Sequence, residues 1–188
     1  MTSAELDLVL AAQRGDRAAM TALLERHRER LLRFLTVMTG DVAAADDITQ
    51  EALRQAVDGI AQLQRPERFA NWLLSIAVNR CRNWLRDEVQ RQHEGDAVLA
   101  GIPARTRSAL SSIVRRESAT QLALAIDRLP ILLREAFVLF QVEGLPYAEI
   151  AELCGASENT LQVRVHRARG LLRRQLGAVV DTWWQRSR

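Results

Sequence analysis

Apolar side chains recur every three or four residues through the first 90 positions, the spacing of helices that bury one face. The stretch "SAELDLVLAAQR" predicts a short amphipathic helix that ends at Gly15. Asp16 is placed to cap a second helix, which "TGD" at 39–41 is expected to end. His27 lies among charged neighbours in that helix, so we expect it to be exposed.

Two more helices are predicted in the first half of the chain. The third runs from about residue 45 to 63, and the fourth covers residues 69–89, "FANWLLSIAVNRCRNWLRDEV". The loop "QRPERF" separates them, because the residue before Pro66 is driven out of the helical conformation. In the third helix the spacing turns one set of side chains inward and another outward: Ile48, Ala52, Leu53 and Val57 inward, Asp47, Gln50, Glu51 and Arg54 outward.

The helical periodicity fades over residues 91–116, where Gly, Pro and Ser become more frequent, as is typical of a linker. The chain is therefore predicted to be all-α. Two small helical domains, residues 1–90 and 117–188, are expected on either side of this flexible linker.

The second domain reads as a series of short helices. "ATQLALAIDRLP" ends at Pro130, and the strongly apolar "ILLREAFVLFQVE" is closed by Gly144. Pro146 suits the first position of the next helix, "PYAEIAELC". After the tight turn "GAS", Ser157 is placed to cap the last helix. Two short helices joined by a turn that contains Gly, the second helix basic, are typical of a helix-turn-helix.

One face of the last helix is apolar and the other is rich in base-reading groups. Leu161, Val165, Ala168 and Leu172 recur at spacings of four, three and four, so we expect them in the core. The outer side chains are then Gln162, Arg164, His166, Arg167 and Arg169. Gln162 suits adenine, and Arg164 or Arg167 suits guanine, with the other Arg side chains available for phosphates.

Charge changes sign abruptly within the second domain. The whole chain carries a formal charge of +3, but residues 119–158 hold two Arg against six acidic residues, and residues 159–188 hold seven Arg against one. Such a polarised surface favours a polyanionic partner at its basic end.

Several other functional classes lack support in the sequence. Cys81 and Cys154 lie far apart without a second thiol or His at ligand spacing, so we expect no metal site and no disulfide. There is no glycine-rich phosphate loop and no nucleophile–base pairing, so we expect no catalytic residues, no cofactor and no small-molecule substrate. No apolar run reaches membrane length and the N-terminus lacks a signal pattern, which predicts a cytoplasmic protein.

Both halves of the chain resemble one protein family. "RLP", "EGLPYAEIAE" and "TLQVRVHRAR" resemble the C-terminal DNA-binding domain of bacterial sigma factors of the extracytoplasmic-function group, within the sigma-70 family. "LLRFLTVMTGDVAAADDITQEAL" and "FANWLLSIAVNRCRNWLRD" resemble the other conserved domain of that group. The resemblance implies an alternative sigma factor. Its first domain would bind core RNA polymerase and melt the −10 promoter element, and its second would bind the −35 element as a duplex.

The resemblance also assigns residues by motif. The polymerase-binding face would comprise Asp47, Gln50, Glu51 and Arg54, and the −10 face Asn79, Arg82 and Asn83. The −35 face would comprise Ser157, Asn159, Gln162, Val163, Arg164, His166 and Arg167. The chain departs from the family where Leu63 and "QRPER" replace an aromatic residue and a small polar loop that captures a flipped base. The resemblance assigns no role to Trp183 and Trp184.

The partners implied are core RNA polymerase, promoter DNA and an anti-sigma factor, which in this group is often anchored in the membrane. Two alternatives stay open. A helix-turn-helix transcription regulator would account for the second domain but not for the first. A decoy that mimics a sigma factor, and binds an inhibitor without starting transcription, should lose the basic character of the last helix, which this chain keeps.

Overall fold

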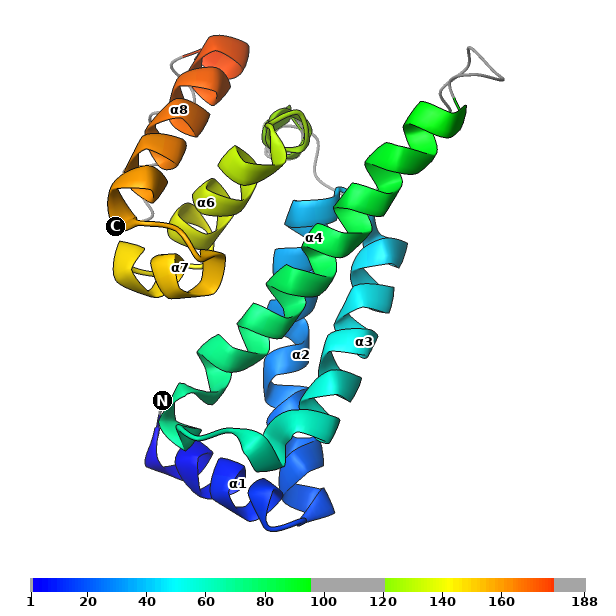
Figure 1. Cartoon of the computed structure of the whole chain (residues 1–188), viewed down its shortest axis with the longest axis vertical. Coiled ribbons are helices and arrows are strands. Elements are labelled where there is room, and N and C mark those ends of the chain that lie inside the picture. The colour runs from blue at the N-terminus through cyan, green and yellow to red at the C-terminus, as the bar shows by residue number, and fades with distance from the viewer. Residues whose placement is uncertain (1, 96–120, 178–188) are drawn as a thin grey trace, which may run out of the picture. The chain divides into compact units, whose positions relative to one another are not determined.

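The computed structural model describes residues 2–95 and 121–177, which divide into two compact units (Figure 1). One unit is built mainly from the helices of the first half and the other from those of the second half. Within the described residues every regular element is a helix, as the all-α prediction requires. None of these helices is long and apolar enough to cross a membrane.

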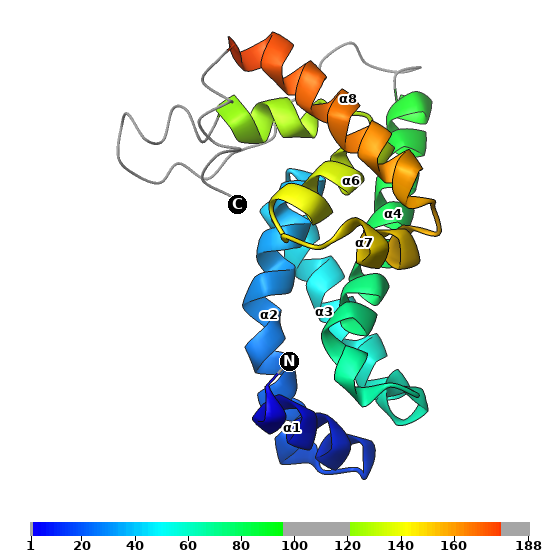
Figure 2. The ribbon, with the colours of Figure 1, turned by 90° about the vertical axis from the view of Figure 1, so that its left-hand side faces the viewer.

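Four helices supply the first unit, which comprises the described residues up to 36 and residues 42–86. They are α1 (Ser3–Gln13), α2 (Arg17–Thr39), α3 (Val42–Gly59) and α4 (Phe69–Gly95). Two 3₁₀ turns, η1 (Ile60–Gln62) and η2 (Pro66–Arg68), lie between α3 and α4. Figures 1 and 2 show α2, α3 and α4 side by side, with α1 across one end of the three.

The predicted ends of the first two helices are confirmed, whereas the third helix, predicted from about residue 45 to 63, runs from Val42 to Gly59. Gly15 and Gly40 adopt positive φ angles of 91° and 68° after α1 and α2, where residues with a Cβ are strained. The carboxylate oxygen Oδ1 of Asp16 accepts the backbone N–H groups of Ala18 and Ala19 at 2.9 and 3.1 Å, which caps α2.

The core of the first unit follows the predicted apolar stripes, with one error in α3. Ile48 and Ala52 are buried and Leu53 is half-buried, but Val57 is 47% exposed. Ala56 takes the inward position instead, because it lies four residues after Ala52 on the same helix face. In α4 the apolar spacing predicts a buried stripe of Trp72, Leu73, Ile76, Ala77 and Leu85. The last four are buried, whereas Trp72 is only half-buried.

The expectation that His27 is exposed is wrong. The residue is 8% exposed, and its Nε2 atom lies 2.7 Å from Oε1 of Glu5 in α1. Its ring also meets Phe69 edge to face, with centroids 5.4 Å apart. The charged neighbours in sequence were misleading, because His27 projects from the face of α2 that meets α1 and the start of α4.

The fourth helix is longer than predicted. It continues to Gly95, so residues 91–95, which we assigned to the linker, are helical. Polar residues alone do not stop a helix, and this stretch contains no proline before Gly95. The rest of the predicted linker, and Trp183 and Trp184, lie outside the described residues.

The second unit consists of a helical segment at 121–127 followed by α6 (Ile131–Gln141), α7 (Tyr147–Cys154) and α8 (Glu158–Leu176). Gly144 and Gly155 have φ angles of 69° and 61° and form the turns before α7 and α8. The hydroxyl of Ser157 accepts the backbone N–H of Thr160 at 3.2 Å, the predicted cap of α8. Pro146 precedes the first residue of α7 rather than occupying it.

The core of the second unit rests on the predicted stripe of α8. Its buried residues are Leu161, Val165, Ala168 and Leu172, the four that the spacing turned inward. Arg134 on α6 is also buried, and it donates to the Asp127 carboxylate at 3.0 Å and to the Leu129 carbonyl at 3.4 Å. This arginine therefore joins the end of segment 121–127 to α6.

Candidate functional site

The exposed surface of α8 carries most of the predicted −35 residues. Gln162, His166 and Arg167 are exposed, Arg164 is half-buried, and Val163 is 43% exposed. Ser157 and Asn159 are exposed at the N-terminal end of the same helix. This end, with its free backbone N–H groups and positive dipole, favours contact with an anion. The residues thus form one continuous polar surface on one helix.

Val163 occupies the centre of that surface. It follows Leu161 by two residues, which rotates it about 200° from the buried stripe. Asn159 and Arg167 lie four residues to either side and flank it on the same face. An apolar side chain at this position suits contact with the methyl group of thymine.

Arg169 does not belong to this surface, contrary to the expectation that it lies on the outside. Its Nη2 atom donates to Oε1 of Gln141 on α6 at 2.6 Å, and its guanidinium lies over the ring of Phe140, 5.5 Å from the centroid. Phe140 in turn stacks on Tyr147 of α7, with centroids 4.4 Å apart and an interplanar angle of 11°. Arg169 therefore connects α8 to α6 and, through Phe140, to α7.

Tyr147 in this cluster remains protonated at neutral pH. Burial raises the pKa of its hydroxyl, and the positive charge of Arg169 opposes that shift only in part. The stack is therefore a neutral aromatic pair beneath a cation, the arrangement in which cation–π attraction operates.

Replacing Arg169 by Gln tests whether this residue holds α8 in place or contacts phosphate. Because its guanidinium faces α6, we expect Arg169→Gln to lower affinity for a cognate duplex about three- to tenfold, through loss of a cation–π contact and a hydrogen bond. The slope of log affinity against log salt concentration should not change. Arg173→Gln, on the exposed side of the same helix, should reduce the slope by about one. Titrations at several salt concentrations measure both, and a reduced slope for Arg169→Gln would contradict the assignment.

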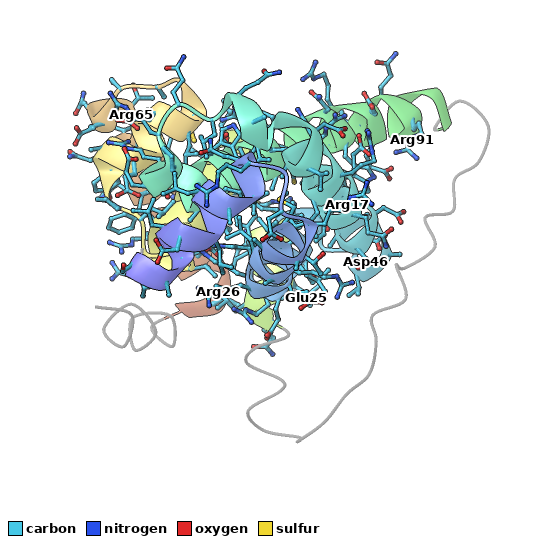
Figure 3. The ribbon with its side chains drawn as sticks, turned by 90° about the horizontal axis from the view of Figure 1, so that it is seen from below. Arg17, Glu25, Arg26, Asp46, Arg65 and Arg91 are labelled. Carbon is cyan, nitrogen blue, oxygen red and sulfur yellow. The ribbon has the colours of Figure 1, made fainter. Side chains whose placement is uncertain are left out.

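The predicted polymerase-binding residues lie on the solvent side of α3. Asp47, Gln50 and Arg54 are exposed and Glu51 is half-buried. Gln50 donates to the Asp46 carboxylate at 2.7 Å, and the same carboxylate accepts a hydrogen bond from Arg28 of α2 at 2.8 Å. Asp46 is labelled in Figure 3.

Glu51 is the centre of an ion-pair network on this face. Arg54 binds it through two hydrogen bonds of 2.7 and 2.9 Å, and Arg80 of α4 lies 3.3 Å from its Oε1. The hydrogen bonds from Arg54 lower the pKa of Glu51, to which the positive charges of Arg54 and Arg80 also contribute. The same pairing raises the pKa of Arg54, which also contacts Asp58 at 3.2 Å. The face therefore presents fixed charges at neutral pH, and Arg80 belongs to it although the sequence did not single it out.

The predicted −10 residues share one face of α4. Asn79 and Asn83 are exposed and stand four residues apart, and Arg82 is half-buried between them. The side-chain oxygen of Asn83 accepts a hydrogen bond from Arg86 at 2.9 Å. Arg80 points elsewhere, since its Nε donates to Gln55 of α3 at 2.9 Å.

Among the described residues, no group of three or more His, Cys, Asp or Glu side chains is placed to hold a metal ion. Cys81 is buried and Cys154 is half-buried, and both are free thiols. Helix α7, the turn at Gly155 and the basic helix α8 define a helix-turn-helix protein.

Comparison with known proteins identifies the family. Residues 23–91 match the family model "Sigma-70 region 2", and residues 119–172 match "Sigma-70, region 4". The chain is 31% identical over 173 residues to the ECF RNA polymerase sigma factor SigM of Mycobacterium tuberculosis, covering 92% of this chain and 85% of that protein. It is 27% identical to the ECF RNA polymerase sigma factor SigW of Bacillus subtilis, covering 87% and 92%. The chain belongs to the extracytoplasmic-function (ECF) group of RNA polymerase sigma factors.

One further relative is much longer than this chain, and two solved structures share its fold. The chain is 36% identical over 152 residues to the "Probable RNA polymerase sigma factor RfaY" of Xanthomonas campestris pv. campestris, and spans 37% of the length of that protein. The solved structure of CnrH with the cytosolic domain of CnrY superposes with a TM-score of 0.68 at 23% identity, over 96% of this chain and 99% of that one. The sigma factor RpoE of Bartonella quintana, solved with the anti-sigma factor NepR, gives 0.66 at 22% identity, over 83% and 95%. Both share the fold.

Proposed function

We propose that this protein is an alternative sigma factor that binds core RNA polymerase and directs promoter-specific initiation of transcription. The observation that carries the proposal is the match to region 2 and region 4 in one chain, in that order, together with the basic exposed face of α8. Core polymerase would supply the chemistry, and this protein would contribute binding and no catalytic residue. Such a protein would work in the cytoplasm, where polymerase and the chromosome meet.

The proposed binding roles follow the predicted domains. Residues 1–90 would bind polymerase and the −10 element, and residues 117–188 would bind the −35 element. The linker between them would start after α4 ends at Gly95, not at residue 91, and run to residue 116. The polymerase contact is assigned to the α3 residues Asp47, Gln50, Glu51 and Arg54, whose exposed charges suit a polar protein interface.

The DNA contacts are assigned to two helices. Asn79, Arg82 and Asn83 on α4 would contact the separated −10 strand, since amide and guanidinium groups bind unpaired bases. Ser157, Asn159 and the outer residues of α8 would enter the major groove of the −35 duplex. Of these, Gln162, Val163, Arg164, His166 and Arg167 are the candidates for base contacts.

Control by an anti-sigma factor is part of the proposal. The structural relative RpoE is known in complex with the anti-sigma factor NepR. An inhibitor of that kind, free or anchored in the membrane, could cover the polymerase-binding face of α3 and the reading face of α8. The alternative function is that of a helix-turn-helix regulator that binds promoters without polymerase. It is disfavoured because it does not account for the match of residues 23–91 to region 2.

Affinity for core polymerase is the property that separates these alternatives. We expect Asp47→Ala to weaken binding to purified core polymerase by about tenfold, because truncating an interface residue that acts as a hot spot costs on the order of 1 kcal/mol or more. Fluorescence anisotropy of labelled protein, titrated with core polymerase without DNA, measures the change.

The matched control is Glu25→Ala, which removes the same charge from an exposed position on α2, labelled in Figure 3. It should bind core polymerase like the wild type. If the Asp47 and Glu25 variants bind core polymerase with equal affinity, the assignment of Asp47 to the polymerase interface is wrong. Failure of the wild-type protein to bind core polymerase would favour the regulator instead.

A further inference from the structure

A side-chain amide joins the first helix of the chain to the loop that leads into α4. Gln13 is the last residue of α1, and its Nε2 atom donates to the carbonyl oxygens of Ile60 at 3.1 Å and Leu63 at 2.8 Å. The Ile60 carbonyl also accepts the backbone N–H of Leu63 at 3.1 Å, which closes the turn η1. One amide group therefore holds both ends of that turn.

The other end of this loop is also fixed. The backbone N–H of Arg68 donates to the carbonyl of Arg65 at 2.9 Å and closes η2. The next residue, Phe69, is fully buried against His27 of α2 and lies 5.8 Å, centroid to centroid, from Trp72. Residues 60–68, the clamped loop, are thus held at one end by Gln13 and at the other by Phe69.

Between these two points the clamped loop presents polar groups to solvent. Gln62, Gln64, Arg65 and Glu67 are exposed, and Arg65 is labelled in Figure 3. Amide, guanidinium and carboxylate groups are those that read the edges of bases. The loop runs directly into α4, which carries the proposed −10 residues.

A recognition loop discriminates between similar ligands only when its backbone is held in one conformation, since looseness of about 1 Å removes selectivity. The buried side chain of Ile60 anchors the start of the loop, but the exposed residues that follow cannot supply that rigidity themselves. Here the two Gln13 hydrogen bonds supply it, and they add one donor to the Leu63 carbonyl and a second donor to the Ile60 carbonyl.

We propose that Gln13 is a positioning residue for −10 recognition, which it serves by fixing the shape of the clamped loop. Through this amide, α1 would set the base preference of a loop that lies 47 residues further along the chain. The inference rests on the proposed function, because it requires that the first unit reads the −10 strand.

Gln13→Met tests the inference, because Met has a similar length but no N–H donors. The probe is a single-stranded oligonucleotide with the −10 sequence that wild-type holoenzyme selects from a random pool, compared with one that carries a single base change. We expect the variant holoenzyme to lose about five- to twentyfold of the wild-type discrimination, the lower part of the range for two net hydrogen bonds. Affinity for core polymerase and for the −35 duplex should equal that of the wild type.

Two more variants make the outcome decisive. Gln175→Met, at an exposed position of α8, is the matched control and should keep full discrimination. Gln13→Asn has an amide too short to reach both carbonyls, so it should repeat the loss, and it replaces Gln13→Met if that variant does not fold. Unchanged discrimination, or equal losses in −10, −35 and polymerase binding, would overturn the inference while the proposed function stands. A wild-type holoenzyme that shows no −10 preference would overturn both.

Discussion

Replacing Arg164 and Arg167 together by Ala is expected to weaken binding of holoenzyme to a −35 duplex by at least about thirtyfold. A bidentate contact between a guanidinium and a guanine is worth roughly 1–3 kcal/mol, so two such contacts are worth about 2–6 kcal/mol. Both side chains lie outside the buried stripe of α8, so the fold should survive their truncation. Affinity for the cognate duplex and for a scrambled duplex of equal length measures the effect.

The control removes the same charge from the same helix. Arg173→Ala with Arg174→Ala should lower affinity for both duplexes to a similar degree, because exposed Arg side chains in the last turns of α8 favour phosphate contacts. The Arg164 and Arg167 variant should instead reduce the ratio of cognate to scrambled affinity. If the two double variants reduce that ratio equally, the base-reading assignment is wrong.

Leu172→Ala should destabilise the second unit by about 2–5 kcal/mol, the usual range for truncating a fully buried leucine. The side chain is 0% exposed and belongs to the stripe that packs α8 on the rest of its unit. A loss of this size is a large share of the stability of a small domain, so −35 binding should fall with it. Urea unfolding followed by circular dichroism measures the change in the unfolding free energy.

Leu132→Ala is the matched control for this prediction. Leu132 lies on α6 of the same unit but is 52% exposed, so the same truncation should change stability by no more than about 0.5 kcal/mol. Comparable losses for the two variants would mean that the stripe of α8 does not hold the unit together. Full-length protein serves for both measurements.

The elements that sequence predicted well are those with a strong local signal. The stripe Leu161, Val165, Ala168 and Leu172 repeats over about three turns, so a single helical phase fits it. Capping by Asp16 and Ser157 also depends on residues only two or three positions away. The α3 stripe was predicted less well, because Ala56 and Val57 are both apolar and the pattern does not tell which one faces the core.

The features that sequence did not predict depend on residues far apart in the chain. His27 is paired with Glu5 and Phe69, and Gln13 binds carbonyl groups 47 and 50 residues away. Arg169 borders the reading face of α8 but turns toward Gln141, 28 residues earlier. The pattern of polar and charged residues along the sequence predicts that such side chains face solvent. It carries no information on which distant residue will accept a hydrogen bond from them.

Run-off transcription tests the central claim most directly. Purified core polymerase would be supplied, with or without this protein, with a library of templates that carry randomised promoter sequences. We predict transcripts that start at defined positions only when the protein is present, from templates that share two sequence elements. The Arg164 and Arg167 variant should lose selection of the upstream element, and Asn79→Ala should weaken selection of the downstream one. Binding to polymerase without defined starts on any template would contradict the account and favour a decoy.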